Sequence, residues 1–371
     1  MEKIPVGILG ATGMVGQQYI ALLANHPWFE VRYVAASPRS AGKLYSEAVG
    51  GKWNATRGDL GGTSRLDAAS LIVEDANDVT KAAAAVKRGD CAFVFSALEM
   101  GKDEITALED SYAAAGIPVV SNASANRWTS DVPMLIAEVN PGHADIIPLQ
   151  KKNRGWDKGF IAVKPNCSIQ SYMTPLWALL QAGYGVQRII VSTLQAVSGG
   201  GYPGVPSLDI VDNVVPYIGG EEEKTEQEPL KILGSIQGNS FVNAPGPKIS
   251  AHCNRVPVID GHTACVSLEF GAKKPSIDEI KRIWTDFRAL PQELDLPMAP
   301  NQPIIIREEP NRPQPRKDRD AEKGMAVSIG RLRPCNVFDI RFVAVSHNTV
   351  RGAAGGGILN AELLKAKGYL G

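Results

Sequence analysis

The chain has 371 residues, 44% of them hydrophobic, which is enough to bury a large core and favours two domains over one. It carries 39 basic and 39 acidic residues, so no net positive charge attracts nucleic acid or anionic lipid, and a charged substrate must be recognised locally. The five cysteines are widely spaced without a CxxC pair, which argues against a disulfide framework and a structural zinc site. The N-terminus lacks secretory features and no apolar run has transmembrane length, so we expect a cytoplasmic protein without a metal.

The first part of the chain alternates between strand-like and helix-like segments. From Val6 to about Ile136, apolar runs such as VGIL, FEVRYVAA, CAFVFSAL and IPVVS are separated by segments such as MVGQQYIALLA and KAAAAVKR. This alternation predicts a Rossmann-type, doubly wound parallel sheet, which we place in a domain of residues 1–159.

The second part has longer runs with a period of two, namely RIIVSTLQAV, HTACVSLEF, AVSIGRL and FDIRFVAV. They predict a second domain, residues 160–346, built on a mostly antiparallel sheet with one covered face. The glycine-rich, then helical C-terminus, residues 347–371, is expected to pack back on the first domain. Two polar stretches rich in glycine or proline, residues 46–67 and 307–320, are expected to be surface loops.

A glycine motif follows the first strand. Gly10, Gly13 and Gly16 form GATGMVG between VGIL and a predicted helix. Glycines at this turn let the backbone approach a pyrophosphate, and the helix N-terminus supplies free amides for it. The alternative is a glycine-rich turn that binds no nucleotide. The strand, turn and helix context favours a dinucleotide.

The end of the second strand indicates which dinucleotide binds. EVRYVAA lacks the terminal acidic residue that accepts hydrogen bonds from an NAD ribose, and it is followed by Ser37, Arg39, Ser40 and Lys43. These cations and hydroxyls suit a 2′-phosphate and predict NADP, although a solvated basic turn is the alternative. We assign the following residues to the cofactor site: Gly10, Thr12, Gly13, Met14, Val15, Ser37, Arg39, Ser40, Lys43, Ser96, Ala97, Ser198, Gly199 and Asn348.

Cys167 is the candidate nucleophile. It lies in KPNCS, between an apolar strand and a helix predicted from Ser171 to Ala182. The positive end of a helix and its free amides stabilise a thiolate, so we expect rapid alkylation of Cys167. The alternative, a small buried hydrophobe, is kept for Cys91 and Cys265 because both lie in apolar strand patterns.

His262 is the candidate acid/base group. It follows a glycine in RVPVIDGHT, and Arg255 begins the same motif. A cysteine nucleophile needs a partner that moves protons near neutral pH, and histidine is the usual choice. Spacing alone does not pair His262 with Cys167.

Four motifs, GATGMVGQ, PNCS, QAVSGGG and RVPVIDGHT, occur in an order and spacing that resemble the aspartate-semialdehyde dehydrogenases of the fungal and archaeal branch. The resemblance covers essentially the whole chain. It implies that Cys167 is the nucleophile, that His262 is the acid/base catalyst and that Gln195 orients a thioester intermediate. It also implies that Arg255 grips the substrate carboxylate, a task suited to a planar, two-pronged cation.

The same resemblance implies the rest of the substrate site. Glu221 matches the residue that holds the substrate amine, although Glu222 or Glu223 could take this role, and Lys224, Asn122 and Arg127 match positions around a phosphate pocket. The implied reaction is the reduction of aspartyl 4-phosphate by NADPH through a cysteine thioester, with release of phosphate and aspartate 4-semialdehyde, in lysine, threonine and methionine biosynthesis. A homodimer or homotetramer is expected, with no nucleic-acid or membrane partner.

Three alternatives stay open. Malonyl-CoA reductase would use the same nucleophile. N-acetyl-glutamyl-phosphate reductases usually have a glycine before the cysteine, where this chain has Asn166. A sensor that binds NADP without catalysis is disfavoured because Cys167, His262, Gln195 and Arg255 are all present.

Overall fold

The computed structural model describes residues 2–55 and 67–371, and its N-terminal part is built on a six-stranded sheet. All neighbouring strands are parallel, in the order β3-β2-β1-β4-β5-β6, which confirms the doubly wound prediction. The last strand lies just beyond the expected boundary at residue 159. The strands are β1 (Ile4–Leu9), β2 (Phe29–Ala36), β3 (Val73–Asp75), β4 (Phe93–Ser96), β5 (Val119–Ser121) and β6 (Ile161–Val163).

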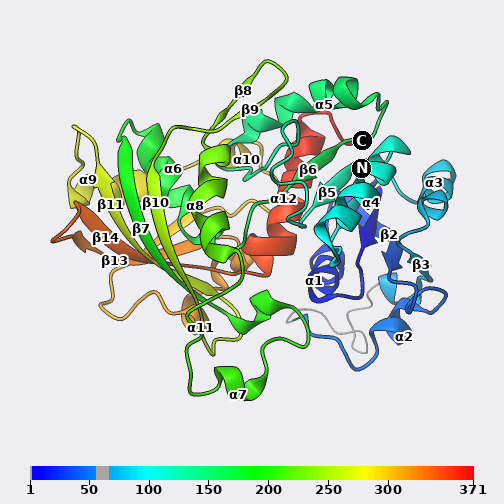
Figure 1. Ribbon diagram of the computed structural model, residues 1–371, viewed down its shortest axis with the longest axis horizontal. Coiled ribbons are helices and arrows are strands. Elements are labelled where there is room, and N and C mark those ends of the chain that lie inside the picture. Colours follow the sequence, from blue (N-terminus) through cyan, green and yellow to red (C-terminus); the bar gives the residue numbers. More distant parts are fainter. Residues whose placement is uncertain (1, 56–66) are drawn as a thin grey trace.

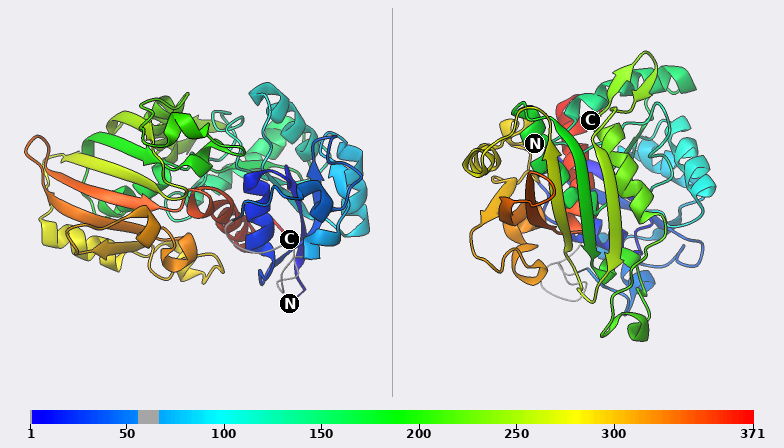
Figure 2. Two further views of the ribbon diagram at one scale, coloured as in Figure 1. Left: turned by 90° about the horizontal axis from the view of Figure 1, so that it is seen from below. Right: turned by 60° about the vertical axis from the view of Figure 1, so that its left-hand side comes forward.

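Helices cover both faces of this sheet (Figure 1). On one face, α1 (Met14–Leu23) and α12 (Gly355–Ala366) bury apolar side chains against β1 and β4. On the other, α3 (Val79–Arg88) and α4 (Lys102–Ala114) pack on the same strands. The C-terminal helix α12 therefore completes the N-terminal core, and Figure 2 shows it between the two sheets.

The second sheet is mixed, in the order β10-β7-β11-β14-β13-β12. The pairs β10/β7 and β12/β13 are parallel and the other three pairs are antiparallel, which confirms the mostly antiparallel prediction. Its strands are β7 (Val186–Gln195), β10 (Lys248–Arg255), β11 (His262–Phe270), β12 (Ile304–Arg307), β13 (Val327–Pro334) and β14 (Ile340–Ser346), and β8 (Ser235–Gln237) pairs separately with β9 (Ser240–Val242).

One face of the second sheet is covered by helices. Trp284 of α9 (Ile277–Asp286) packs against Phe342 of β14 with ring centroids 5.1 Å apart. The opposite face leaves Ile190 and Leu194 partly exposed and Cys265 exposed. The expectation that Cys265 is buried is therefore wrong, because alternate residues of β11 point to opposite faces and Cys265 belongs to the open one.

The remaining helices connect these layers. They are α2 (Tyr45–Val49), α5 (Ile147–Arg154), α6 (Met173–Gln181), α7 (Ser207–Ile210), α8 (Glu221–Ile232), α9 (Ile277–Asp286), α10 (Leu290–Glu293) and α11 (Pro315–Asp318). Short 3₁₀ helices span Asp67–Ser70, Pro141–Ile146, Ile169–Ser171, Val197–Gly200 and Ala321–Gly324, and a π-helical turn spans Val350–Ala354. No helix in the described ranges has both the length and the apolar character needed to cross a membrane.

The two polar stretches differ from simple surface loops. The first begins with α2, and most of its remainder, residues 56–66, lies outside the described residues. The second ends in α11, whose Asp318 is 1% exposed and accepts hydrogen bonds from the Arg312 side chain at 2.7 Å and the Gln314 amide at 2.6 Å. Residues 308–311, 316 and 317 are exposed, as expected of a surface segment, and its charges pair around this one buried carboxylate.

Candidate active site

A pocket of about 350 Å³ lies where the two sheets meet, and both domains contribute to its lining. Met14, Val15 and Ala97 come from the first sheet's glycine turn and strand ends, while Cys167 and Ser198 come from the segments that follow β6 and β7. The pocket therefore joins the predicted cofactor motif to the predicted nucleophile. The described ranges contain no cluster of histidine, cysteine and carboxylate side chains arranged to hold a metal ion.

Three predicted residues meet at one edge of the second sheet. Gln195 ends β7 and Arg255 ends the parallel strand β10, where the two residues are register partners. His262 begins β11, which runs antiparallel to β7 from the same edge. Strand register, rather than sequence spacing, brings these three side chains together.

The structure places Cys167 beside His262, with 3.3 Å between Sγ and Nε2. The other ring nitrogen, Nδ1, accepts the backbone N–H of Ala196 at 3.0 Å. In the neutral ring the proton is therefore on Nε2, directed toward the sulfur. Burial, together with the charge of Arg255, lowers the pKa of His262 to about 3, so the ring is neutral at physiological pH.

The environment of Cys167 differs from the one expected. A 3₁₀ turn follows the cysteine, and α6 begins only at Met173. Burial and the nearby carboxylate of Glu221 raise the pKa of the thiol to about 11, although the cations of Lys164 and Arg127 act in the opposite direction. The expected lowering of the thiol pKa is therefore wrong, because desolvation outweighs the end of a short helical turn.

Lys164, to which the sequence assigned no role, is 2% exposed and lines the same pocket. Its Nζ donates a hydrogen bond of 2.7 Å to the carbonyl oxygen of Pro165. Burial, followed by the charge of Arg127, lowers its pKa to about 7. Its burial beside Arg127, which only the fold creates, explains why its charge state was not predictable.

The backbone amides around Cys167 are mostly occupied. The N–H of Asn166 donates to Glu228 at 2.6 Å, and the N–H of Ser168 donates to the side chain of Asn166 at 2.7 Å. Within the described part of the chain, the amide of Cys167 itself has no hydrogen-bond acceptor. This amide is therefore available to stabilise an oxyanion.

Glu221 is the carboxylate of the EEEK segment that reaches the pocket. It is 8% exposed and accepts hydrogen bonds from Asn166 at 2.9 Å, Gln195 at 3.2 Å and Lys224 at 2.8 Å. Although burial acts to raise it, these partners hold its pKa below the usual value. Glu222 instead accepts the backbone N–H of Cys253 at 3.1 Å, and Glu223 is exposed.

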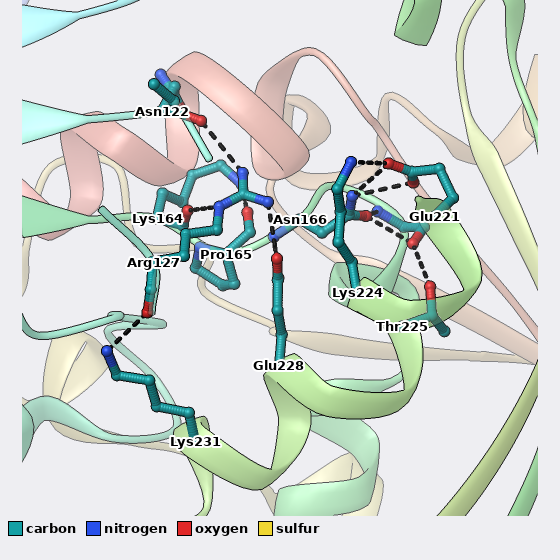
Figure 3. Close-up of polar contacts among 12 residues, drawn as sticks. Asn122, Arg127, Lys164, Pro165, Asn166, Glu221, Lys224, Thr225, Glu228 and Lys231 are labelled. Atoms are coloured by element: carbon teal, nitrogen blue, oxygen red, sulfur yellow. Dashed lines mark hydrogen bonds and ion pairs between the residues drawn. The ribbon is translucent and has the colours of Figure 1, made fainter. Parts of the chain in front are cut away.

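The predicted phosphate-pocket residues Asn122, Arg127 and Lys224 all line the pocket. Arg127 is 6% exposed, and its guanidinium donates to the carbonyl oxygens of Lys164 and Asn122 and to the carboxylate of Glu228 (Figure 3). Sequence analysis missed Glu228. The available signal was its spacing from Glu221, since residues seven apart share a face of one helix.

The glycine turn has the geometry that a nucleotide site requires. Gly10 has a φ of +73°, and a Cβ there would lie 2.3 Å from the carbonyl oxygen of Ala97. Gly13 is the N-cap of α1 without a side-chain cap, so the first amides of that helix remain open to a ligand. Thr12 belongs to this turn and is partly buried. These residues fit a dinucleotide phosphate.

The other predicted cofactor residues divide into two groups. Ser198, Gly199 and Asn348 line the pocket, where the Asn348 side chain donates to Ser198 at 2.8 Å. Ser96 is fully buried at the end of β4 and does not line the pocket. Outside the pocket lies the turn after β2, which carries four residues: Ser37, Arg39, Ser40 and Lys43.

Two protein-family models match this chain and define its class. Residues 5–147 match the semialdehyde dehydrogenase NAD binding domain, and residues 176–351 match the semialdehyde dehydrogenase dimerisation domain. With the nucleotide turn and the cysteine–histidine pair, these matches define a semialdehyde dehydrogenase that forms homo-oligomers.

The relatives narrow the class. The aspartate-semialdehyde dehydrogenase of Archaeoglobus fulgidus is 46% identical over 98% of both chains, and that of Methanothermobacter thermautotrophicus is 48% identical over 97% of this chain and 99% of its own. The crystal structure of the Candida albicans enzyme with NADP superposes with a TM-score of 0.86 at 40% identity, covering 99% of this chain and 100% of that one. The chain belongs to the aspartate-semialdehyde dehydrogenase family, as its motifs indicated.

Proposed function

We propose that this protein reduces aspartyl 4-phosphate to aspartate 4-semialdehyde with NADPH, through a thioester on Cys167, and releases inorganic phosphate. The observation that carries the proposal is the 3.3 Å contact between His262 Nε2 and the Sγ of Cys167, a residue that lines a pocket together with a nucleotide turn and buried cations. Relatives named aspartate-semialdehyde dehydrogenase, one of them solved with NADP, support it.

Each residue has a chemical task in this proposal. Cys167 reacts as its thiolate, after the thiol proton has passed to solvent. Its sulfur attacks the acyl carbon, the bond from that carbon to the phosphate oxygen breaks, and the phosphate leaves toward Arg127 and Lys224. Arg255 holds the substrate carboxylate and Glu221 holds the amine. Bound NADPH supplies a hydride to the thioester carbon. Gln195 lies against Glu221 and orients the thioester from there.

His262 acts as a proton donor in the resting protein because its Nδ1 already accepts the Ala196 amide. Its Nε2–H stabilises negative charge first on the sulfur and then on the carbonyl oxygen. When the sulfur departs from the reduced carbon, the oxygen forms the aldehyde and the same N–H stabilises the returning thiolate. The free amide of Cys167 is the second donor for the oxygen.

The oligomer we propose is a homodimer formed through the open face of the second sheet. Ile190 is 43% exposed and Leu194 is 36% exposed on this face, within the residues matched by the dimerisation domain. These two apolar side chains, which lie beside exposed polar residues such as Ser250 and His252, gain stability when a second copy of the chain covers them.

Reduction of malonyl-CoA, reduction of N-acetyl-glutamyl phosphate and NADP sensing are less well supported. Among the described residues that line the pocket, no contact favours any of the three over aspartyl 4-phosphate reduction.

A spectrophotometric assay in the oxidative direction tests the proposed reaction. Reduced nicotinamide should form only when aspartate semialdehyde, phosphate and NADP are all present. Cys167→Ser should abolish this signal, whereas Cys335→Ser, at a partly exposed position outside the pocket, should preserve it. Reduction of NADP without phosphate would contradict the phosphorylating mechanism.

A further inference from the structure

A second carboxylate of α8 lies behind the pocket. Glu228 is 0% exposed and lies seven residues after Glu221 on the same helix. One of its oxygens accepts the Arg127 guanidinium at 2.8 Å, and the other accepts the backbone N–H of Asn166 at 2.6 Å. Figure 3 shows α8 presenting both carboxylates, with Arg127 bound to Glu228 and Asn166 between the two.

The contact to Glu228 determines how Arg127 is presented to a ligand. A guanidinium has five N–H donors. Three of them are committed, to the carbonyl oxygens of Lys164 at 3.0 Å and Asn122 at 3.2 Å and to the carboxylate of Glu228. The remaining two belong to a buried side chain that lines the pocket, so they are available to an anion in a fixed orientation.

The contact to Asn166 fixes the turn that carries the nucleophile. Glu228 accepts the backbone N–H of Asn166. The side-chain NH₂ group of Asn166 donates to both carboxylate oxygens of Glu221, each at 2.9 Å. The next residue is Cys167. Its backbone amide, which has no acceptor in the described part of the chain, is therefore held in place from the preceding peptide.

We propose that Glu228 is a positioning residue that sets Arg127 and the Cys167 turn in the relative geometry needed for a phosphoryl-bearing acyl group. The proposal rests on the proposed function, because phosphate is the group that Arg127 receives when the thioester forms. Glu228 itself touches neither the substrate nor the reacting atoms.

An ionised carboxylate is required for this task. Its two oxygens accept from a guanidinium and from a backbone amide at once, and it has no donor of its own. A glutamine of the same shape has one acceptor oxygen, and its NH₂ group would face either the guanidinium or the Asn166 N–H. A buried ion pair alone contributes little net stability, because the loss of hydration offsets the attraction between the charges. The feature that points to function is therefore that one carboxylate contacts both the Arg127 guanidinium and the Asn166 N–H.

The test compares Glu228→Gln with Glu226→Gln. Glu226 lies on the same helix but accepts the backbone N–H of Ala251 at 3.0 Å on β10, away from the pocket, so it is the matched control. We expect Glu228→Gln to weaken the binding of inorganic phosphate, measured by calorimetry on the complete chain, by about tenfold or more. The Michaelis constant for phosphate should rise similarly, that for the semialdehyde should change less than about twofold, and Glu226→Gln should alter neither.

A second variant covers the case in which Glu228→Gln does not fold. Glu228→Asp keeps the charge but is one methylene shorter, so it cannot reach both partners, and it should show the same selective loss to a smaller degree. In an Arg127→Met background, Glu228→Gln should have almost no further effect on phosphate binding.

Unchanged phosphate binding and an unchanged Michaelis constant for phosphate in a folded Glu228 variant would overturn the proposal. Equal losses for phosphate and semialdehyde, with a lowered melting temperature, would also overturn it in favour of a purely structural role. If the unmutated protein lacked the proposed activity but bound phosphate, the proposed reaction would fail while the calorimetric comparison still decided the role of Glu228.

Discussion

The thiol of Cys167 lies among charges that act on it in opposite directions. Burial and Glu221 raise its pKa to about 11, while Lys164, Arg127 and Arg255 oppose them. Because the neutral His262 donates from Nε2 rather than accepting there, it cannot take the thiol proton in this arrangement. Activation of the nucleophile therefore depends on the charge balance of the pocket.

This balance gives the first prediction. Alkylation of Cys167 by iodoacetamide in the free protein should be slow at pH 7 and should rise about tenfold per pH unit up to about pH 10, because only the thiolate reacts. Glu221→Gln removes the nearby negative charge, so it should lower the thiol pKa and speed labelling, measured by peptide mass spectrometry. Glu222→Gln, whose carboxylate contacts β10 instead, is the control. A rate that levels off near pH 8 in the unmutated protein would contradict the prediction.

A second prediction separates binding from chemistry. Arg255→Lys keeps the charge but loses the two-pronged contact, so it should raise the Michaelis constant for the semialdehyde and reduce kcat/KM by roughly 30- to 1000-fold, equivalent to about 2–4 kcal/mol. His262→Asn should instead lower kcat with a modest effect on binding. Steady-state kinetics of both variants decides the matter, and an unchanged Michaelis constant in Arg255→Lys would remove this arginine from the carboxylate site.

A third prediction concerns cofactor choice. Arg39 is exposed in the turn after β2, where no acidic side chain ends the strand. Arg39→Ala should weaken NADP binding by about tenfold or more and leave NAD binding nearly unchanged, since only NADP carries the 2′-phosphate. Lys87→Ala, on the distant helix α3, is a charge-matched control. Equal affinity of the unmutated protein for both cofactors, measured by fluorescence titration, would refute the preference.

At the scale of elements, α8 connects the nucleophile to the second sheet. It contains Pro229, which has no N–H to donate to the carbonyl oxygen of Thr225 one turn earlier. The hydroxyl of Tyr172, which precedes α6, donates to that oxygen at 3.1 Å. The helix interruption is therefore satisfied by a residue from the segment that follows Cys167.

The fourth prediction tests this link. Tyr172→Phe should lower the free energy of unfolding by about 1–3 kcal/mol because it leaves a buried carbonyl without a donor. Pro229→Ala restores an N–H at the missing position, so the cost of Tyr172→Phe should be clearly smaller in that background. Urea denaturation of the four proteins gives both values. Tyr184→Phe, whose hydroxyl donates to Glu279 at 3.3 Å in a partly exposed position, should cost less. Identical costs in both backgrounds would disprove the link.

At the scale of the whole molecule, the second sheet contributes one face to the core and leaves the other open. The covered face belongs to a hydrophobic cluster that continues into the first domain. The open face carries Ile190, Leu194 and Cys265 on neighbouring strands. Exposed apolar side chains on an uncovered sheet face are typical of a subunit interface.

The fifth prediction follows from that face. Ile190→Asp should convert the proposed dimer into monomers, because a charge placed in an apolar interface loses its hydration without gaining a partner. Light scattering coupled to size-exclusion chromatography measures the mass. Val337→Asp, in the turn between β13 and β14 and 83% exposed, should leave the mass unchanged. A dimer that survives Ile190→Asp would place the interface elsewhere.

Local patterns in the sequence were sufficient for several features of the protein. The alternation of strands and helices predicted the parallel sheet, and the period of two predicted the mostly antiparallel one, because both patterns report how side chains face a core. The glycine turn was predictable for the same reason, since Gly10 occupies a conformation and a space that other residues cannot. These properties depend on neighbours in the chain.

The arrangement of the site was decided by tertiary structure. The contact of Cys167 with His262 depends on the end of β6 and the start of β11, which lie in different sheets. The roles of Glu221 and Glu228 depend on which face of α8 turns toward the pocket. The sequence of this segment, with its many charged residues, is equally typical of a solvent-exposed helix and does not indicate which of them are buried. The pKa values of Cys167 and Lys164 were unpredictable because desolvation and the charges of distant residues act through space rather than along the sequence.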